Sequence, residues 1–122
     1  MVVEPRVISV VDDDSSVRAA LGSLLRSDGF DVRLYPSGED VLADRTSVPD
    51  CLVCDIKMPG MSGWDLCAHL KALDRWAPTI LITAYPDERT CRPIGLDMRI
   101  LEKPFDGKQL VHEILSLISH SY

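Results

Sequence analysis

Strand-like and helix-like segments alternate along this chain, and the alternation restricts the folds it can adopt. Five segments have strand composition, and helical patterns lie between and after them. The strands are predicted at Val7–Val11, Phe30–Tyr35, Cys51–Cys54, Thr79–Thr83 and Met98–Glu102. Because parallel strands need crossover connections, this alternation predicts an α/β fold with a parallel sheet and helices on both faces.

The composition of each strand predicts its place in the sheet. The first, third and fourth strands are apolar on both faces, as buried central strands are. The second carries Asp31 and Arg33, and the fifth carries Arg99 and Glu102, which is typical of edge strands. We therefore expect a doubly wound, flavodoxin-like sheet of five parallel strands in the order 2-1-3-4-5.

Three helical segments have apolar residues three or four positions apart. These stripes are Val17, Leu21, Leu24 and Leu25; Leu66, Leu70 and Leu73; and Leu110, Ile114, Leu117 and Ile118. Capping-box patterns begin at Ser37, Ser62 and Asp106, each with Asp or Gln three positions later. Between Thr83 and Met98, however, Pro86 and Pro93 predict that the fourth helix is short or irregular, because proline disrupts a helix interior.

Length and charge set further limits. The 122 residues, 46% of them hydrophobic, predict a single domain spanning residues 1–122. No apolar run approaches the ~20 residues of a membrane span, and the first residues lack a secretory signal, so we expect a cytoplasmic protein without membrane contact. A net charge of −6 argues against direct nucleic-acid contact by this chain.

The four cysteines do not form a recognisable metal or redox motif. Cys51 and Cys54 have C-x-x-C spacing, but they lie within one predicted strand, where residues three apart point to opposite faces. Cys67 and Cys91 belong to no motif. We expect four reduced, structural thiols.

Chemically active side chains follow the ends of four predicted strands. Asp12 and Asp13 follow the first strand, Asp55 the third, Thr83 ends the fourth, and Lys103 follows the fifth. Singly, each has an ordinary interpretation: a turn or helix cap for an Asp, a structural hydroxyl for Thr83, a solvated charge for Lys103. Together they meet at the carboxyl edge of the sheet, where doubly wound folds bind ligands.

Three carboxylates at that edge would repel one another by roughly 4 kcal/mol per pair at 4 Å and a dielectric of 20. A cation is therefore expected among them, and Mg²⁺ suits a small site of oxygen ligands. An Asp beside Mg²⁺, with a hydroxyl and an ammonium group for phosphoryl oxygens, is equipped to form an aspartyl phosphate.

The motifs VVDDD, LVCDIKMPGMSG, ITA and LEKPF, in this order, resemble the receiver domain of bacterial two-component response regulators over essentially the whole chain. The resemblance implies that Asp55 accepts a phosphoryl group from a phosphohistidine of a sensor histidine kinase. It implies that Asp13, Asp55 and the backbone carbonyl of Lys57 bind Mg²⁺, and that Asp12 does so through water. Thr83 and Lys103 would bind phosphoryl oxygens, and the Lys103–Pro104 peptide would be cis.

The resemblance also implies a switch rather than an ordinary enzyme, since such a domain catalyses only its own phosphorylation and dephosphorylation. Phosphorylation would alter the face formed by the fourth helix, the fifth strand and the last helix, and it would allow a homodimer. The chain would be a stand-alone regulator or a fragment of a longer one.

Two features depart from the family pattern. Ile100 stands where an inward-turning aromatic residue is usual, and Thr83 and Lys103 are 20 positions apart, about two fewer than expected. A phosphorylation-independent, receiver-like protein-binding module is therefore the alternative. A flavin or nucleotide binder is disfavoured by the acidic, glycine-free loop after the first strand. A phosphatase with an aspartyl nucleophile would need an acid where Lys57 stands.

These departures lead to a prediction about switching. Phosphorylation should reshape the segment Pro86–Arg99 without an aromatic rotation at position 100, because Ile100 has no ring to turn inward. Amide hydrogen exchange across this segment should change on phosphorylation, and unchanged exchange there would count against it.

Overall fold

The computed structural model describes residues 4–84 and 97–120. The strands are β1 (Val7–Val11), β2 (Asp31–Tyr35), β3 (Cys51–Asp55), β4 (Thr79–Thr83) and β5 (Met98–Glu102). The helices are α1 (Ser15–Ser27), α2 (Gly38–Ala43), α3 (Gly63–Ala72) and α4 (Gly107–His120). The short or irregular helix expected before β5 falls on residues 85–96, outside the described residues, and α4 is the last helix of the chain.

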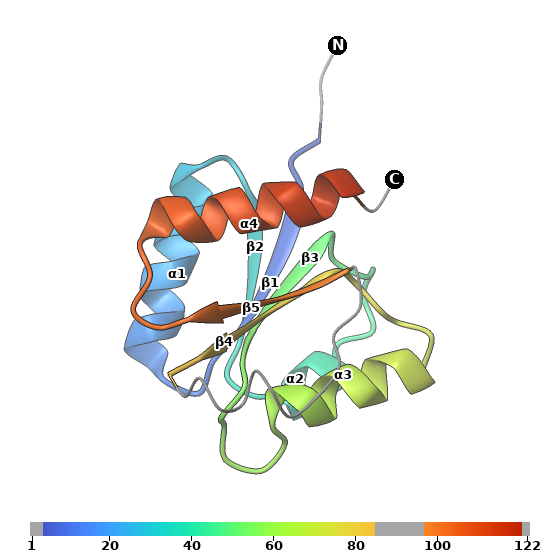
Figure 1. Ribbon diagram of the computed structural model, residues 1–122. Coiled ribbons are helices and arrows are strands. Elements are labelled where there is room, and N and C mark those ends of the chain that lie inside the picture. Colours follow the sequence, from blue (N-terminus) through green and yellow to red (C-terminus); the bar gives the residue numbers. More distant parts are fainter. Residues whose placement is uncertain (1–3, 85–96, 121–122) are drawn as a thin grey trace.

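The strands form one parallel sheet in the order β2-β1-β3-β4-β5, as the edge and centre compositions predict. Helices α1 and α4 cover one face, and α2 and α3 cover the other (Figure 1). In register, Val11 lies beside Cys54 and Asp55 beside Ile82. The carboxyl ends of β1, β3 and β4 therefore meet at one edge of the sheet.

Two buried clusters, one on each face, hold the layers together. Leu25 of α1 and Ile114 of α4 pack on the first face, and Leu66 of α3 packs on the second. Cys51 belongs to the first cluster and Cys54 to the second, so the two thiols lie on opposite faces of β3, as expected. Cys51, Cys54 and Cys67 are free and buried, whereas Cys91 lies outside the described residues.

One apolar position was predicted wrongly. Leu73 was expected in the apolar stripe of the third helix, but α3 ends at Ala72 and Leu73 is the C-cap residue, with 53% of its surface exposed. The chain leaves the helix at Asp74, whose φ is 56°. The last residue to which the helical period applies is therefore Ala72, and the period does not place Leu73.

The start of α3 lies unusually close to the end of β3. Ser62 and Asp65 form a reciprocal capping box, with both hydrogen bonds 3.1 Å long. The N–H of Gly63 donates to the carbonyl of Ile56, at 2.9 Å. A Cβ atom on Gly63 would lie 2.7 Å from the carbonyl oxygen of Asp55, so only glycine allows this approach. The same contact helps to place Asp55.

Gly63→Ala should therefore lower the free energy of unfolding by about 1–3 kcal/mol, because backbone must move to admit the methyl group. Gly38→Ala is the matched control, since Gly38 also follows a serine N-cap, but a Cβ atom there would meet the flexible Met61 side chain, 2.8 Å from its Sδ. Gly38→Ala should change the free energy of unfolding by less than about 1 kcal/mol, because the higher helix propensity of alanine offsets a small displacement of the Met61 side chain. If urea denaturation shows equal losses in the free energy of unfolding for Gly63→Ala and Gly38→Ala, the close fit at Gly63 does not have the proposed effect.

Candidate functional site

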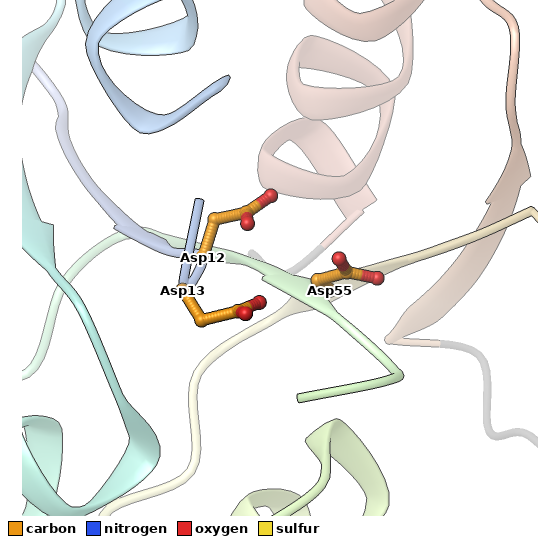
Figure 2. A group of neighbouring side chains, drawn as sticks. All are labelled: Asp12, Asp13 and Asp55. Carbon is orange, nitrogen blue, oxygen red and sulfur yellow. The ribbon is translucent and has the colours of Figure 1, made fainter. Parts of the chain in front are cut away.

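Three carboxylates converge at the carboxyl edge of the sheet. Asp12 and Asp13 follow β1, and Asp55 ends β3; one carboxylate oxygen from each lies within 4.8 Å of the others. Figure 2 shows the side chains of Asp12 and Asp13 extending toward the side on which Asp55 lies. The predicted meeting of these acids at one edge is confirmed.

The three adjacent aspartates after β1 have different environments. Asp12 is buried, with 3% of its surface exposed, and its Oδ1 accepts a hydrogen bond from the N–H of Asp14 at 2.9 Å. Asp13 is exposed. Asp14 is the N-cap of α1, because its Oδ1 accepts from the N–H groups of Ser16 and Val17. The triplet therefore combines two members of the acidic cluster with one helix cap.

Lys103 places a positive charge beside this cluster. Its Nζ lies 3.5 Å from Oδ2 of Asp55, whose side chain is 13% exposed. The N–H of Lys103 donates to the carbonyl of Thr83 at 2.8 Å, which fixes the turn after β5 against the end of β4. Thr83 is buried, with 1% of its surface exposed, and the Lys103–Pro104 peptide is cis, as predicted. Lys57 is exposed in the loop after β3.

Burial and repulsion both disfavour charge on Asp12 and Asp55. Loss of hydration raises the pKa of Asp12; the Asp14 N–H lowers it in part, and the charge of Asp55 raises it further. Burial also raises the pKa of Asp55, against the opposing effects of Lys103 and of a backbone hydrogen bond from Lys57. Without a bound cation, the folded protein therefore holds these protons more tightly than the unfolded chain does.

The donor set fits a small hard cation. Mg²⁺ takes six oxygen ligands at about 2.1 Å, so two directly bound oxygens lie at most about 4.2 Å apart. The carboxylate oxygens, within 4.8 Å of one another, need only a small contraction to meet this limit. One exposed member leaves the cluster accessible from solvent.

One contact at the site was not anticipated from the sequence. Nη1 of Arg18, in α1, lies 2.6 Å from the backbone carbonyl oxygen of Asp12 and donates a hydrogen bond to it. A basic residue one turn into the helix after an acidic loop was the available signal, although spacing alone does not show which acceptor it reaches.

Comparison with known proteins identifies a family for most of the chain. Residues 8–115 match the family model described as the response regulator receiver domain. The chain is 35% identical over 115 residues to nodulation protein W of Bradyrhizobium diazoefficiens, covering 90% of this chain and 50% of that protein. It is 37% identical over 111 residues to the DNA-binding response regulator MtrA of Mycobacterium tuberculosis, covering 88% and 48%. The chain thus spans about half the length of these curated relatives.

Among solved structures, the response regulator TrrA of Thermotoga maritima, in complex with Mg²⁺-BeF, superposes with a TM-score of 0.79 at 27% identity. The match covers 92% of this chain and 98% of that one. No helix in residues 4–84 and 97–120 has the length and apolar character needed to cross a bilayer.

The carboxylate cluster should cost stability when no metal is bound. At 4.8 Å and a dielectric of 20, two carboxylates repel by roughly 3.5 kcal/mol, which Lys103 offsets in part. Asp12→Asn should therefore raise the free energy of unfolding at pH 7, in chelator, by on the order of 1 kcal/mol. Asparagine retains an oxygen that accepts the Asp14 N–H.

The gain should depend on pH in a defined direction. Folding raises the pKa of Asp12, so below pH 3.8 its carboxyl is protonated in both states and does not lower the free energy of unfolding of the wild type. As pH rises through the folded-state pKa, the wild type loses stability relative to Asp12→Asn. Asp14→Asn is the control, because it removes a neighbouring charge while keeping a good N-cap. A stabilised Asp14→Asn protein, or a gain for Asp12→Asn that disappears as pH rises from 4 to 7, would contradict this account.

Proposed function

The chain belongs to the family of response regulator receiver domains, and we propose that it accepts a phosphoryl group on Asp55 from a phosphohistidine of a sensor histidine kinase. The observation that carries this proposal is the placement of Asp55. Its carboxylate lies within the Asp12–Asp13–Asp55 cluster and 3.5 Å from the ammonium group of Lys103. A carboxylate so placed can attack phosphorus while neighbouring groups neutralise the charge of the phosphoryl oxygens.

In the proposed reaction, an oxygen of the Asp55 carboxylate attacks phosphorus as the phosphorus–nitrogen bond of the donor breaks. The electron pair of that bond leaves with the imidazole, and the phosphoryl group becomes an acyl phosphate on Asp55. No oxidant or further reactant is needed. Hydrolysis of the acyl phosphate by water would return Asp55 to its carboxylate form.

The residues around Asp55 support this reaction in different ways. Asp13, Asp55 and the backbone carbonyl of Lys57 would hold Mg²⁺ directly, and Asp12 would do so through water. The bound ion would supply positive charge against the carboxylates and the incoming phosphoryl oxygens. Lys103 would pair with a phosphoryl oxygen in place of its present partner, Asp55 Oδ2. Thr83, at the end of the neighbouring strand, would donate its hydroxyl to another.

The signal would leave the site through β5 and the elements beside it. Ile100, on β5, is partly buried and packs against the cluster under α2 and α3. Its aliphatic side chain supports a switch by displacement of the chain after Thr83 rather than by ring rotation. In this proposal residues 1–122 form one receiver unit, standing alone or leading a longer cytoplasmic regulator. Homodimerisation on phosphorylation and control of a separate DNA-binding output would follow from such an arrangement.

Ile100 also supports a second candidate function. A receiver-like module that binds its partner without phosphorylation would not need the aromatic switch residue. Such a module would bind its partner equally well with Asp55 intact or replaced.

Mass spectrometry after incubation with acetyl phosphate and Mg²⁺ separates the two functions. Wild type and the Asp14→Asn control should each gain the mass of one phosphoryl group, because the Asp14 side chain caps α1 and its backbone N–H, which donates to Asp12, is kept. Asp55→Asn should gain none, and excess chelator should abolish the adduct on wild type. An adduct that persists on Asp55→Asn would refute Asp55 as acceptor, and absence of any adduct on wild type would favour the binding module.

A further inference from the structure

Arg18 joins the first helix to the acidic loop before it. The residue lies in α1, and its N–H donates to the carbonyl of Asp14 as part of the first helical turn. Its side chain returns past the start of the helix, where Nη1 donates to the carbonyl of Asp12 at 2.6 Å. A charged donor at this distance makes a strong hydrogen bond.

This bond completes a set of three that hold Asp12. The N–H of Asp12 donates to the carbonyl of Tyr35 at 3.2 Å, and its Oδ1 accepts from the N–H of Asp14 at 2.9 Å. Both of these bonds use backbone groups as partners. The third, to the carbonyl of Asp12, comes from the Arg18 side chain and can be removed by substitution without changing the loop sequence.

The carbonyl that Arg18 holds belongs to the peptide unit between Asp12 and Asp13. Because a peptide unit is planar, fixing the direction of this carbonyl fixes the direction in which the chain enters Asp13. The Asp13 carboxylate forms no hydrogen bond or ion pair with any residue in the described ranges. Its approach to Asp12 and Asp55, within 4.8 Å, therefore depends on the backbone that carries it.

We propose that Arg18 is a positioning residue for the metal site: by holding the Asp12–Asp13 peptide, it directs the Asp13 carboxylate toward Asp55 and so raises the affinity for a divalent cation. The proposal rests on the proposed function, which requires that cation. Arg18 touches neither the carboxylate oxygens nor the phosphoryl group in this role. Residues that orient direct metal ligands typically change metal affinity by 10–100-fold when they are replaced.

The sign of the change distinguishes positioning from simple electrostatics. If Arg18 acted only through its charge, its removal would make the site more negative and Mg²⁺ would bind more tightly. If Arg18 only stabilised the fold, the unfolding midpoint would fall while the Mg²⁺ affinity of the folded protein stayed the same. Of these three roles, only positioning predicts that the variant stays folded and binds Mg²⁺ more weakly.

The test is a Mg²⁺ titration at constant ionic strength, followed by the amide NMR shifts of the loops around Asp13 and Lys57. Arg18→Met, which keeps the apolar stem and removes the donors, should raise the Kd for Mg²⁺ about tenfold. Arg18→Lys, which keeps one charged donor, should recover part of that loss. Arg26→Met is the control, because Arg26 lies in the last turn of the same helix. It should leave the Kd unchanged.

Phosphorylation provides a second measurement. The Mg²⁺ concentration that gives half-maximal phosphorylation of Arg18→Met by acetyl phosphate should rise with the Kd, while the rate at saturating Mg²⁺ stays near that of wild type. If folded Arg18→Met has an unchanged or lower Kd for Mg²⁺ while wild type binds Mg²⁺, the positioning role of Arg18 is wrong and the proposed function is unaffected. Failure of wild type to bind Mg²⁺ would instead overturn the proposed function.

Discussion

Repulsion among the carboxylates of Asp12, Asp13 and Asp55 is the interaction that the rest of this structure has to counter. The parallel sheet brings them together, because β1 and β3 are hydrogen-bonded neighbours whose carboxyl ends share one edge. Burial of Asp12 strengthens the repulsion by removing the water that would screen it. Lys103 opposes it from the end of β5, and the exposed Asp13 leaves a side of the cluster that a second cation can reach.

The protein holds this unfavourable arrangement mainly through its backbone. Asp12 is fixed by three hydrogen bonds, one donated by its N–H and two accepted by its carbonyl and its carboxylate. Asp55 ends β3, which has a paired strand on each side, and Gly63 allows the start of α3 to pack directly against the Asp55 carbonyl. Rigid strand ends of this kind keep charged groups in position at the cost of stability. The same negative charge that costs stability without a bound cation is what would attract the metal.

Much of the fold was predictable, because the deciding signals are local. Apolar runs identified the central strands, and charges such as Arg33 identified an edge strand. The start of the second strand was placed one residue early, at Phe30 rather than Asp31. Of the three capping-box patterns, Ser62 forms the reciprocal pair, while the Asp106 carboxylate accepts a hydrogen bond from the N–H of Gln109 at the start of α4. The prediction for Leu73 was wrong because the helical period does not show at which residue a helix ends.

Sequence pattern alone was enough to predict the order of the five strands, the edges of the sheet, and which acids, hydroxyl and lysine follow its strands. These follow from side-chain period and charge, which are properties of neighbouring residues. Three contacts at the site became visible in the folded chain: the 3.5 Å approach of Lys103 to Asp55, the close fit at Gly63 and the hydrogen bond from Arg18 to the Asp12 carbonyl. Such contacts depend on strand register, helix position and side-chain conformation, and these are set when distant segments pack together.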